Sequence, residues 1–93
     1  MANLLHLTVV SPEKVLFAGD VKYIHVPGGA GFFGVLVDHV PMLASLKPGP
    51  FEIRPVSGES LKFSTTRPGF FEVVKNRASI LLDALDTGVL QRS

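Results

Sequence analysis

The 93-residue chain has no cysteine, no tryptophan and a single tyrosine. Without cysteine it has no disulfide framework, no thiol nucleophile and no cysteine-ligated metal site. Charged residues are also scarce, at 18% of the chain. Nine basic and eight acidic residues give a net charge of +1. The basic residues form no run, so we expect no nucleic-acid partner.

Long apolar runs are missing as well. An uncharged apolar segment such as residues 31–37 is far shorter than the ~20 residues that a membrane-spanning helix requires. Residues 1–6 lack the basic start, apolar stretch and cleavage site of a secretory signal. We therefore expect mature sequence at the N-terminus, and contact with a membrane only indirectly, through a partner.

Glycine and proline are plentiful, at nine and seven residues, and they divide the chain into short apolar runs. These residues supply the backbone angles that tight turns need. Short runs at this spacing predict an all-β fold, either a sandwich or a barrel. The expected turns are Ser11–Glu13, Ala18–Asp20, Pro27–Gly29, Lys47–Pro50, Ser57–Glu59, Arg67–Gly69 and Lys75–Arg77.

The first run alternates as a half-buried strand does. Leu5, Leu7 and Val9 fall on one side, and His6 and Thr8 fall on the other. We expect the first three side chains in the core.

Two apolar segments break this alternation. Residues 32–33 and 80–82 place apolar side chains on both faces of a strand, so a neighbouring sheet or a partner must cover the second face. Residues 79–85 also have helical spacing, with Ser79 as a candidate cap. We predict a strand here, to about Asp83.

The length allows one domain with a single core, since a chain of this size buries somewhat over ~60% of its unfolded surface. We predict a β-sandwich domain over residues 1–85. A short C-terminal tail over residues 86–93 is expected to follow it.

The segment Gly29–Gly34 reads G-x-G-x-x-G and follows an expected strand over residues 21–26. A dinucleotide site needs a helix at this point, whose N-terminal amides face the pyrophosphate. Here residues 35–37 are apolar, and Pro41 interrupts any helix. The segment therefore favours a glycine hairpin with close backbone approach.

No other group of residues in the sequence indicates a catalytic or metal-binding site. His6, His25 and His39 lack the short spacing of zinc ligands. Ser11, Asp38 and His39 are the three residue types of a hydrolase triad, but no strained strand-to-helix turn surrounds any serine. The acidic residues are scattered and indicate no carboxylate pair. We predict no catalytic residue, no metal and no cofactor.

Residues 41–46, together with Val37 and Val40, form an apolar segment around His39. One interpretation is ordinary sandwich core. The other is a protein interface, because large apolar patches mark such contacts.

Four groups of motifs follow one another along the chain. They are Leu7–Glu13 with Phe17–Gly19; Val26–Pro27 with Gly31 and Gly34–Leu36; His39 with Pro41–Leu43 and Leu46–Gly49; and Gly69–Val73 with Asn76 and Ile80–Asp83. In this order and spacing, they resemble the N-terminal β-sandwich of the epsilon subunit of the rotary F-type ATP synthase. The resemblance covers about residues 4–85.

This resemblance implies an antiparallel β-sandwich of about ten strands at the foot of the central stalk. Such a subunit binds the gamma subunit and the polar loops of the c-ring, turns with them, and couples proton-driven rotation to ATP synthesis without a catalytic site. It implies a peripheral position on the cytoplasmic face of a bacterial inner membrane, or on the stromal thylakoid face in a plastid.

The resemblance also implies two contact surfaces. The gamma-facing surface corresponds to Ser11, His39, Met42, Leu43 and Ala44, with alanine where the family has a threonine. The c-ring contact corresponds to the glycine loop, which consists of Gly28, Gly29, Ala30, Gly31, Phe32 and Phe33.

The chain departs from the family pattern in three further places. Phe32 stands where the family often has a glutamate, which implies a more apolar contact or a different one. Val37–Asp38 replace a Pro-Gly pair before the histidine. The sequence ends at Ser93, without the pair of helices that restrains ATP hydrolysis in the family. If this is the natural end, we expect the restraint on ATP hydrolysis to be absent. The sequence of a truncated chain would end in the same way.

An alternative from another class is a free-standing ligand-binding β-sandwich, such as a carbohydrate-binding module. Sugar platforms favour exposed tryptophan and tyrosine, whereas this chain offers Tyr23 and seven phenylalanines. A small hydrolase is a third interpretation, but it lacks an organised nucleophile.

Overall fold

The computed structural model describes residues 4–82 and the backbone of residues 91–92. Within these ranges the chain forms nine β-strands and no helix, so no described helix is long and apolar enough to cross a bilayer. The strands are β1 (Leu5–Val10), β2 (Val15–Gly28), β3 (Gly31–Val35), β4 (Met42–Leu46), β5 (Gly49–Pro55), β6 (Leu61–Thr65), β7 (Gly69–Val74), β8 (Arg77–Leu82) and β9 (Gln91–Arg92). The predicted all-β fold is confirmed.

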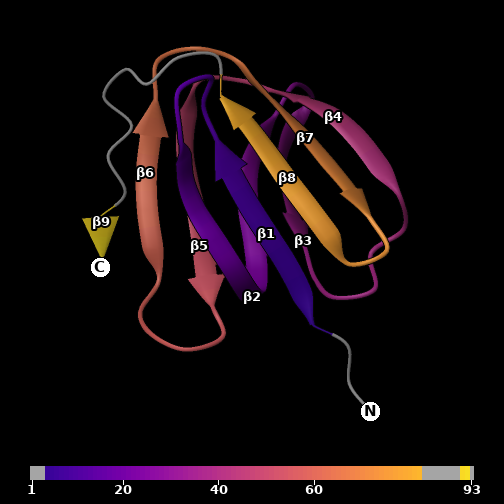
Figure 1. The fold of residues 1–93 in the computed structure, drawn as a ribbon. Coiled ribbons are helices and arrows are strands. Elements are labelled where there is room, and N and C mark those ends of the chain that lie inside the picture. The colour runs from indigo at the N-terminus through magenta and orange to yellow at the C-terminus, as the bar shows by residue number, and fades with distance from the viewer. Residues whose placement is uncertain (1–3, 83–90, 93) are drawn as a thin grey trace.

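The strands form two packed layers (Figure 1). One layer has the order β4-β7-β8-β1 and continues into the first half of β2. The other contains the second half of β2, with β3 on one side and β5, β6 and β9 on the other. Neighbouring strands are antiparallel, except that β1 and β8 are parallel. At the end of β2, Gly28 pairs with Leu46 of β4 and links the two layers.

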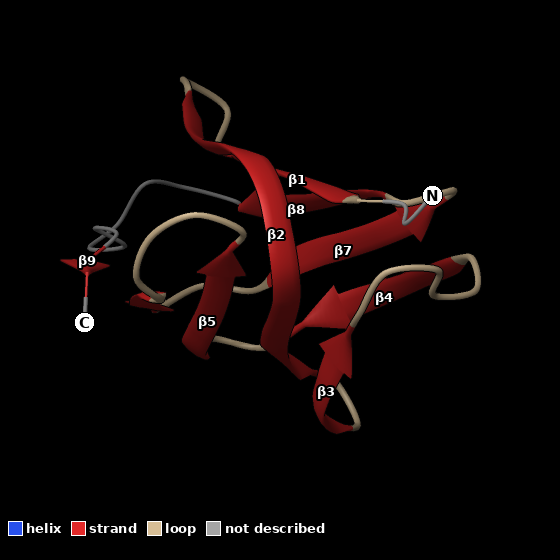
Figure 2. Cartoon of the chain, turned by 90° about the horizontal axis from the view of Figure 1, so that it is seen from below, coloured by secondary structure: helices blue, strands red, loops and turns tan. Residues whose placement is uncertain are grey.

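Strand β2 belongs to both layers, and Figure 2 shows it as one long bent strand. The turn predicted at Ala18–Asp20 is wrong, because Gly19 pairs with Leu7 in the β1–β2 ladder. The ring of Phe17 lies beside Gly19, 3.5 Å from where a Cβ would be. The ring covers this glycine, which has no side chain of its own to pack. The described residues therefore give nine strands where about ten were expected.

The core lies between the two layers and receives inward side chains from β1 to β8. Phe33 of β3 and Phe71 of β7 contact each other across it, with ring centroids 5.6 Å apart and planes at 59°. Phe51 and Phe63 stack between β5 and β6 at 4.9 Å. Such tilted and offset pairs are the favoured aromatic geometries. The Phe33–Phe71 contact therefore joins the two layers, and the Phe51–Phe63 stack joins two strands of one layer.

The alternation predicted for β1 is confirmed. Leu5, Leu7 and Val9 are completely buried, whereas His6 and Thr8 on the other side are only half-buried. Burying apolar area at about 25 cal/mol per Å² is what fixes this strand with its apolar side inward.

Strands β7 and β8 are joined by a two-residue turn. Lys75 and Asn76 have φ angles of 50° and 62°, the pattern of a type I′ turn, whose twist matches that of an antiparallel hairpin. Strand β8 then continues to Leu82, so the strand interpretation of residues 79–85 is confirmed as far as the description reaches. The predicted domain boundary at residue 85 lies outside the described residues.

Candidate functional site

The predicted c-ring residues form the hairpin between β2 and β3. Gly29 and Ala30 make the turn, and Gly28 pairs with Gly31 where the two strands meet. A Cβ at Gly28 would lie 2.8 Å from the carbonyl oxygen of Gly31, so no side chain fits there. The glycine spacing thus serves close backbone approach, as predicted. A strand follows the turn in place of the helix that a phosphate site requires.

Phe32 and Phe33 point to opposite faces of this hairpin. Phe33 packs against the core. Phe32 is 54% exposed and stacks on the ring of His25, with centroids 5.3 Å apart and planes 10° from parallel. The hairpin therefore presents an aromatic surface at the position where the resemblance implies a glutamate.

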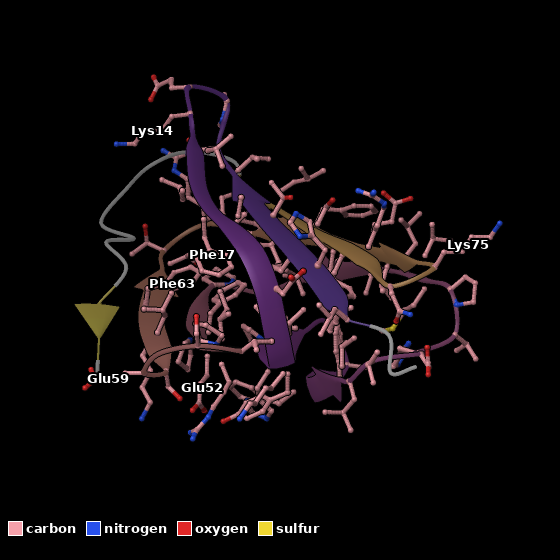
Figure 3. The ribbon with its side chains drawn as sticks, turned by 60° about the horizontal axis from the view of Figure 1, so that its bottom comes forward. Lys14, Phe17, Glu52, Glu59, Phe63 and Lys75 are labelled. Carbon is pink, nitrogen blue, oxygen red and sulfur yellow. The ribbon has the colours of Figure 1, made fainter. Side chains whose placement is uncertain are left out.

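The predicted gamma-facing residues do not all lie together. Ser11 is buried at the end of β1, where its backbone N–H and its hydroxyl both donate to the carbonyl oxygen of Lys14, at 2.9 and 3.4 Å. His39 lies in the loop before β4, and β4 is three strands away from β1 in the layer. Along the strand direction, His39 is at the end of the layer opposite to Ser11. Lys14 and Lys75 mark these two ends in Figure 3.

The predicted residues on β4 divide between two faces. Leu43 points outward and is exposed, while Met42 and Ala44 are half-buried on the inward side, where Met42 packs against the core. In the preceding loop, His39 Nδ1 lies 2.7 Å from the carbonyl oxygen of Val40. Because a carbonyl oxygen only accepts, this ring nitrogen carries the proton. The apolar segment is thus core on one face and surface on the other.

A row of apolar side chains crosses the outer face of the layer. The cross-strand register places Val15 beside Val10, Val10 beside Leu81, and Leu81 beside Phe70. Val10 is half-buried, and the other three are exposed, Leu81 by 44% and Phe70 by 38%. We call these four residues the apolar row. Apolar side chains gathered in this way are typical of a contact surface.

Part of this row had a signal in the sequence. Residues 80–82 break the alternation, and Leu81 is the member of that segment that points outward. The register then gives its neighbours, because Val10, Val15 and Phe70 come together only when four strands pair. The sequence alone carries no sign that these three residues are adjacent.

The apolar row and the glycine hairpin are both adjacent to Ser45. This residue pairs with Phe70 in the β4–β7 ladder, and its carbonyl oxygen accepts a hydrogen bond from Gly29 N–H at 3.1 Å. A shallow hollow of about 320 Å³, with Pro68, Phe70 and Leu81 among its walls, lies beside the row. Ser45 therefore links the strand that flanks the row to the turn of the hairpin.

The three histidines have separate surroundings. His6 Nδ1 lies 3.2 Å from Asp20 Oδ1, His25 belongs to the hairpin stack, and His39 is in the distant loop. Among residues 4–82, no three side chains that bind metals gather at one place. Ser11 lies at the opposite end of the layer from His39, so the three residues of the hydrolase triad do not come together.

Tyr23 is the one tyrosine that a sugar platform would use. Its hydroxyl donates to Glu52 Oε2 at 2.9 Å, and the residue is half-buried. Sugar platforms present an open aromatic face, so this tyrosine does not favour the carbohydrate-binding alternative.

The fold and these surfaces define a class of protein. It is an all-β sandwich that exposes apolar and aromatic side chains on its outer faces. The family model for the β-sandwich domain of the ATP synthase delta/epsilon chain matches residues 4–87. The chain belongs to this family.

Curated relatives extend this match. The ATP synthase epsilon chain of Leptospira interrogans is 48% identical over 82 residues, which cover 88% of this chain and 63% of the relative. The epsilon chain of Desulfosudis oleivorans is 38% identical over 86 residues, covering 92% of this chain and 64% of the relative. The chain therefore spans a little under two thirds of the length of these two relatives.

Two solved structures share the fold. A chain of the Euglena gracilis mitochondrial ATP synthase, in a structure of its OSCP, F1 and c-ring, superposes with a TM-score of 0.79 at 22% identity; the match covers 87% of this chain and 51% of that one. A chain of the Tetrahymena thermophila mitochondrial ATP synthase, in a structure of its central stalk and c-ring, superposes with a TM-score of 0.69 at 20% identity. This match covers 85% of this chain and 63% of that one. At these identities, the likeness supports the β-sandwich fold.

Proposed function

We propose that the chain is the sandwich part of a non-catalytic central-stalk subunit of a proton-translocating F-type ATP synthase. It binds the gamma subunit and the c-ring, and it couples proton-driven rotation to ATP synthesis. It is peripheral to the membrane, on the cytoplasmic face in a bacterium or the stromal thylakoid face in a plastid. The observation that carries the proposal is the presence of two exposed surfaces, the apolar row and the aromatic hairpin, in a chain whose relatives are named as epsilon chains.

The proposal assigns the gamma subunit to the outer face of the β4-β7-β8-β1 layer and the c-ring to the hairpin. Gamma contacts the apolar row at one end of this face, Leu43 on β4, and the loop around His39 at the other end. Ser11 shapes the turn beside the row. The hairpin with Phe32 contacts the c-ring loops. Torque passes between the two contacts because packed protein interiors resist deformation, and the Phe33–Phe71 contact and the Gly29–Ser45 hydrogen bond tie the hairpin to the layer.

The gamma contact is tested by replacing Leu81 with serine. We expect the affinity for purified gamma subunit to fall about tenfold, or ~1.4 kcal/mol, because an apolar side chain at the middle of the row is lost. The matched control is Val56→Ser on the β5–β6 loop, since Val56 is 43% exposed and Leu81 44%. Isothermal titration with wild type and both variants measures the effect.

The wild type is expected to form a one-to-one complex that buries at least ~1,000 Å². Absence of any complex with gamma would contradict the proposed function itself. A complex that Leu81→Ser and Val56→Ser weaken equally would instead show that the apolar row is not its contact surface.

The c-ring contact is tested separately with Phe32→Ser. We expect this variant to lose about tenfold in binding to detergent-solubilised c-ring, because the exposed ring that stacks on His25 is removed. Its affinity for gamma should stay within about twofold of wild type, and Leu81→Ser should show the reverse pattern. Co-sedimentation with the c-ring measures the loss, and unchanged c-ring binding would argue against the hairpin as that contact.

A further inference from the structure

The loop between β3 and β4, residues 36–41, has little packing to fix its course. Leu36 and Val40 are 61% and 69% exposed, although both are apolar. In the middle of the loop, Asp38 has a φ angle of 67°. Residues other than glycine enter this left-handed region at some cost, which is smaller for aspartate and asparagine than for most. An interaction with the rest of the fold would favour this conformation further.

Asn76 supplies that interaction from the β7–β8 turn, 38 residues away in the sequence. The backbone N–H of Asp38 donates to Asn76 Oδ1 at 2.6 Å, and Asn76 Nδ2 donates to Asp38 Oδ1 at 2.9 Å. The two bonds run in opposite directions and so fix both the position and the orientation of Asp38. The second bond has a carboxylate acceptor, which strengthens it. We call this pair the clasp.

The clasp is anchored on the rigid part of the fold. Asn76 has a φ angle of 62° in the type I′ turn, and its carbonyl oxygen accepts from His6 N–H at 2.9 Å. One residue thus joins the start of β1, the β7–β8 hairpin and the exposed loop. The loop is thereby attached to the sheet at Asp38.

We infer that Asn76 is a positioning residue for the gamma-binding surface, which it serves without contacting the partner itself. The clasp holds the backbone at Asp38, next to His39 and Val40, in one conformation at the proposed gamma contact. A free loop would lose conformational entropy on binding, whereas a loop that is already held loses less. This inference rests on the proposed function, but the clasp itself is a property of the chain alone.

The inference also accounts for a departure from the family pattern. The resemblance implies Pro-Gly before the histidine, and glycine adopts positive φ without help. Here Asp38 stands in the glycine position. Its side chain and backbone both bond to Asn76, which compensates for the conformation that aspartate disfavours.

The test compares Asn76→Gly with Lys75→Gly. Both residues have positive φ in the same turn, so glycine suits both backbones, and only the first substitution removes the clasp. We expect Asn76→Gly to lower gamma affinity about tenfold and to accelerate amide hydrogen exchange at Asp38, and Lys75→Gly to change neither by more than about twofold. The double variant Asp38→Asn with Asn76→Asp keeps a donor–acceptor pair, and we expect it to restore both values.

The outcomes separate this inference from the proposed function. If wild type fails to bind gamma, the proposed function is wrong, and the exchange data still decide whether the clasp holds the loop. If wild type binds and the two glycine variants behave alike in affinity, the positioning role is overturned. Faster exchange with unchanged affinity overturns it as well, because a purely structural clasp would give that pattern.

Discussion

Replacement of Phe71 by alanine is expected to lower the free energy of unfolding by about 3–5 kcal/mol. Phe71 is fully buried at the centre of β7, and its ring meets Phe33 across the two layers. Truncation leaves a cavity that the rigid sheets cannot close, so the lost burial and the cavity add together. A domain of this size has a total stability of about 5–15 kcal/mol, and the variant loses a large share of it. Urea unfolding followed by circular dichroism measures the change.

The neighbouring residue provides the matched control. Phe70 carries the same side chain on the same strand, but it points outward and is 38% exposed. We expect Phe70→Ala to cost below about 1 kcal/mol, as outward positions usually do. Equal losses for the two variants would mean that the layers do not pack through Phe71 as described.

Replacement of Gly28 by alanine is expected to destabilise the sandwich by about 1–3 kcal/mol, the usual cost of overpacking. The added Cβ would lie 2.8 Å from the Gly31 carbonyl oxygen, which is backbone and cannot rotate away. Gly28 also pairs with Leu46 where β2 meets β4, so the displacement spreads to the join between the layers. The midpoint of urea unfolding measures the loss, and c-ring binding should weaken with it.

Gly29 is the control for this prediction. A Cβ at Gly29 would be 3.9 Å from its nearest neighbour, the carbonyl oxygen of Ser45, which is an ordinary contact. Gly29→Ala is therefore expected to leave stability within about 0.5 kcal/mol of wild type. A loss as large as that of Gly28→Ala would contradict the assignment of close approach to Gly28 and Gly31.

The features that follow local rules were predicted correctly. Leu5, Leu7 and Val9 are in the core because strand side chains alternate, and the Lys75–Arg77 turn forms where Asn76 tolerates positive φ. The hairpin at the G-x-G-x-x-G segment also followed from local chemistry, since apolar residues and proline exclude the helix that a phosphate site needs.

The wrong prediction has a tertiary cause. Ala18–Asp20 has the composition of a turn, but pairing with β1 places Gly19 in an extended strand. Ladder hydrogen bonds and cross-strand packing outweigh the local preference of glycine. A short sequence window around residue 19 does not include β1. Local preferences within that window therefore could not predict the pairing of Gly19 with Leu7.

The sequence by itself determined the class of fold, most of the turns and the family, because these depend on periodicity, on backbone angles and on motifs that lie close together in the chain. The tertiary structure decided which residues share a surface. The apolar row takes members from β1, β2, β7 and β8, and the clasp joins Asp38 to Asn76 across 38 residues. Strand order and register set such neighbours, and they are fixed only when the whole core packs with its apolar sides inward.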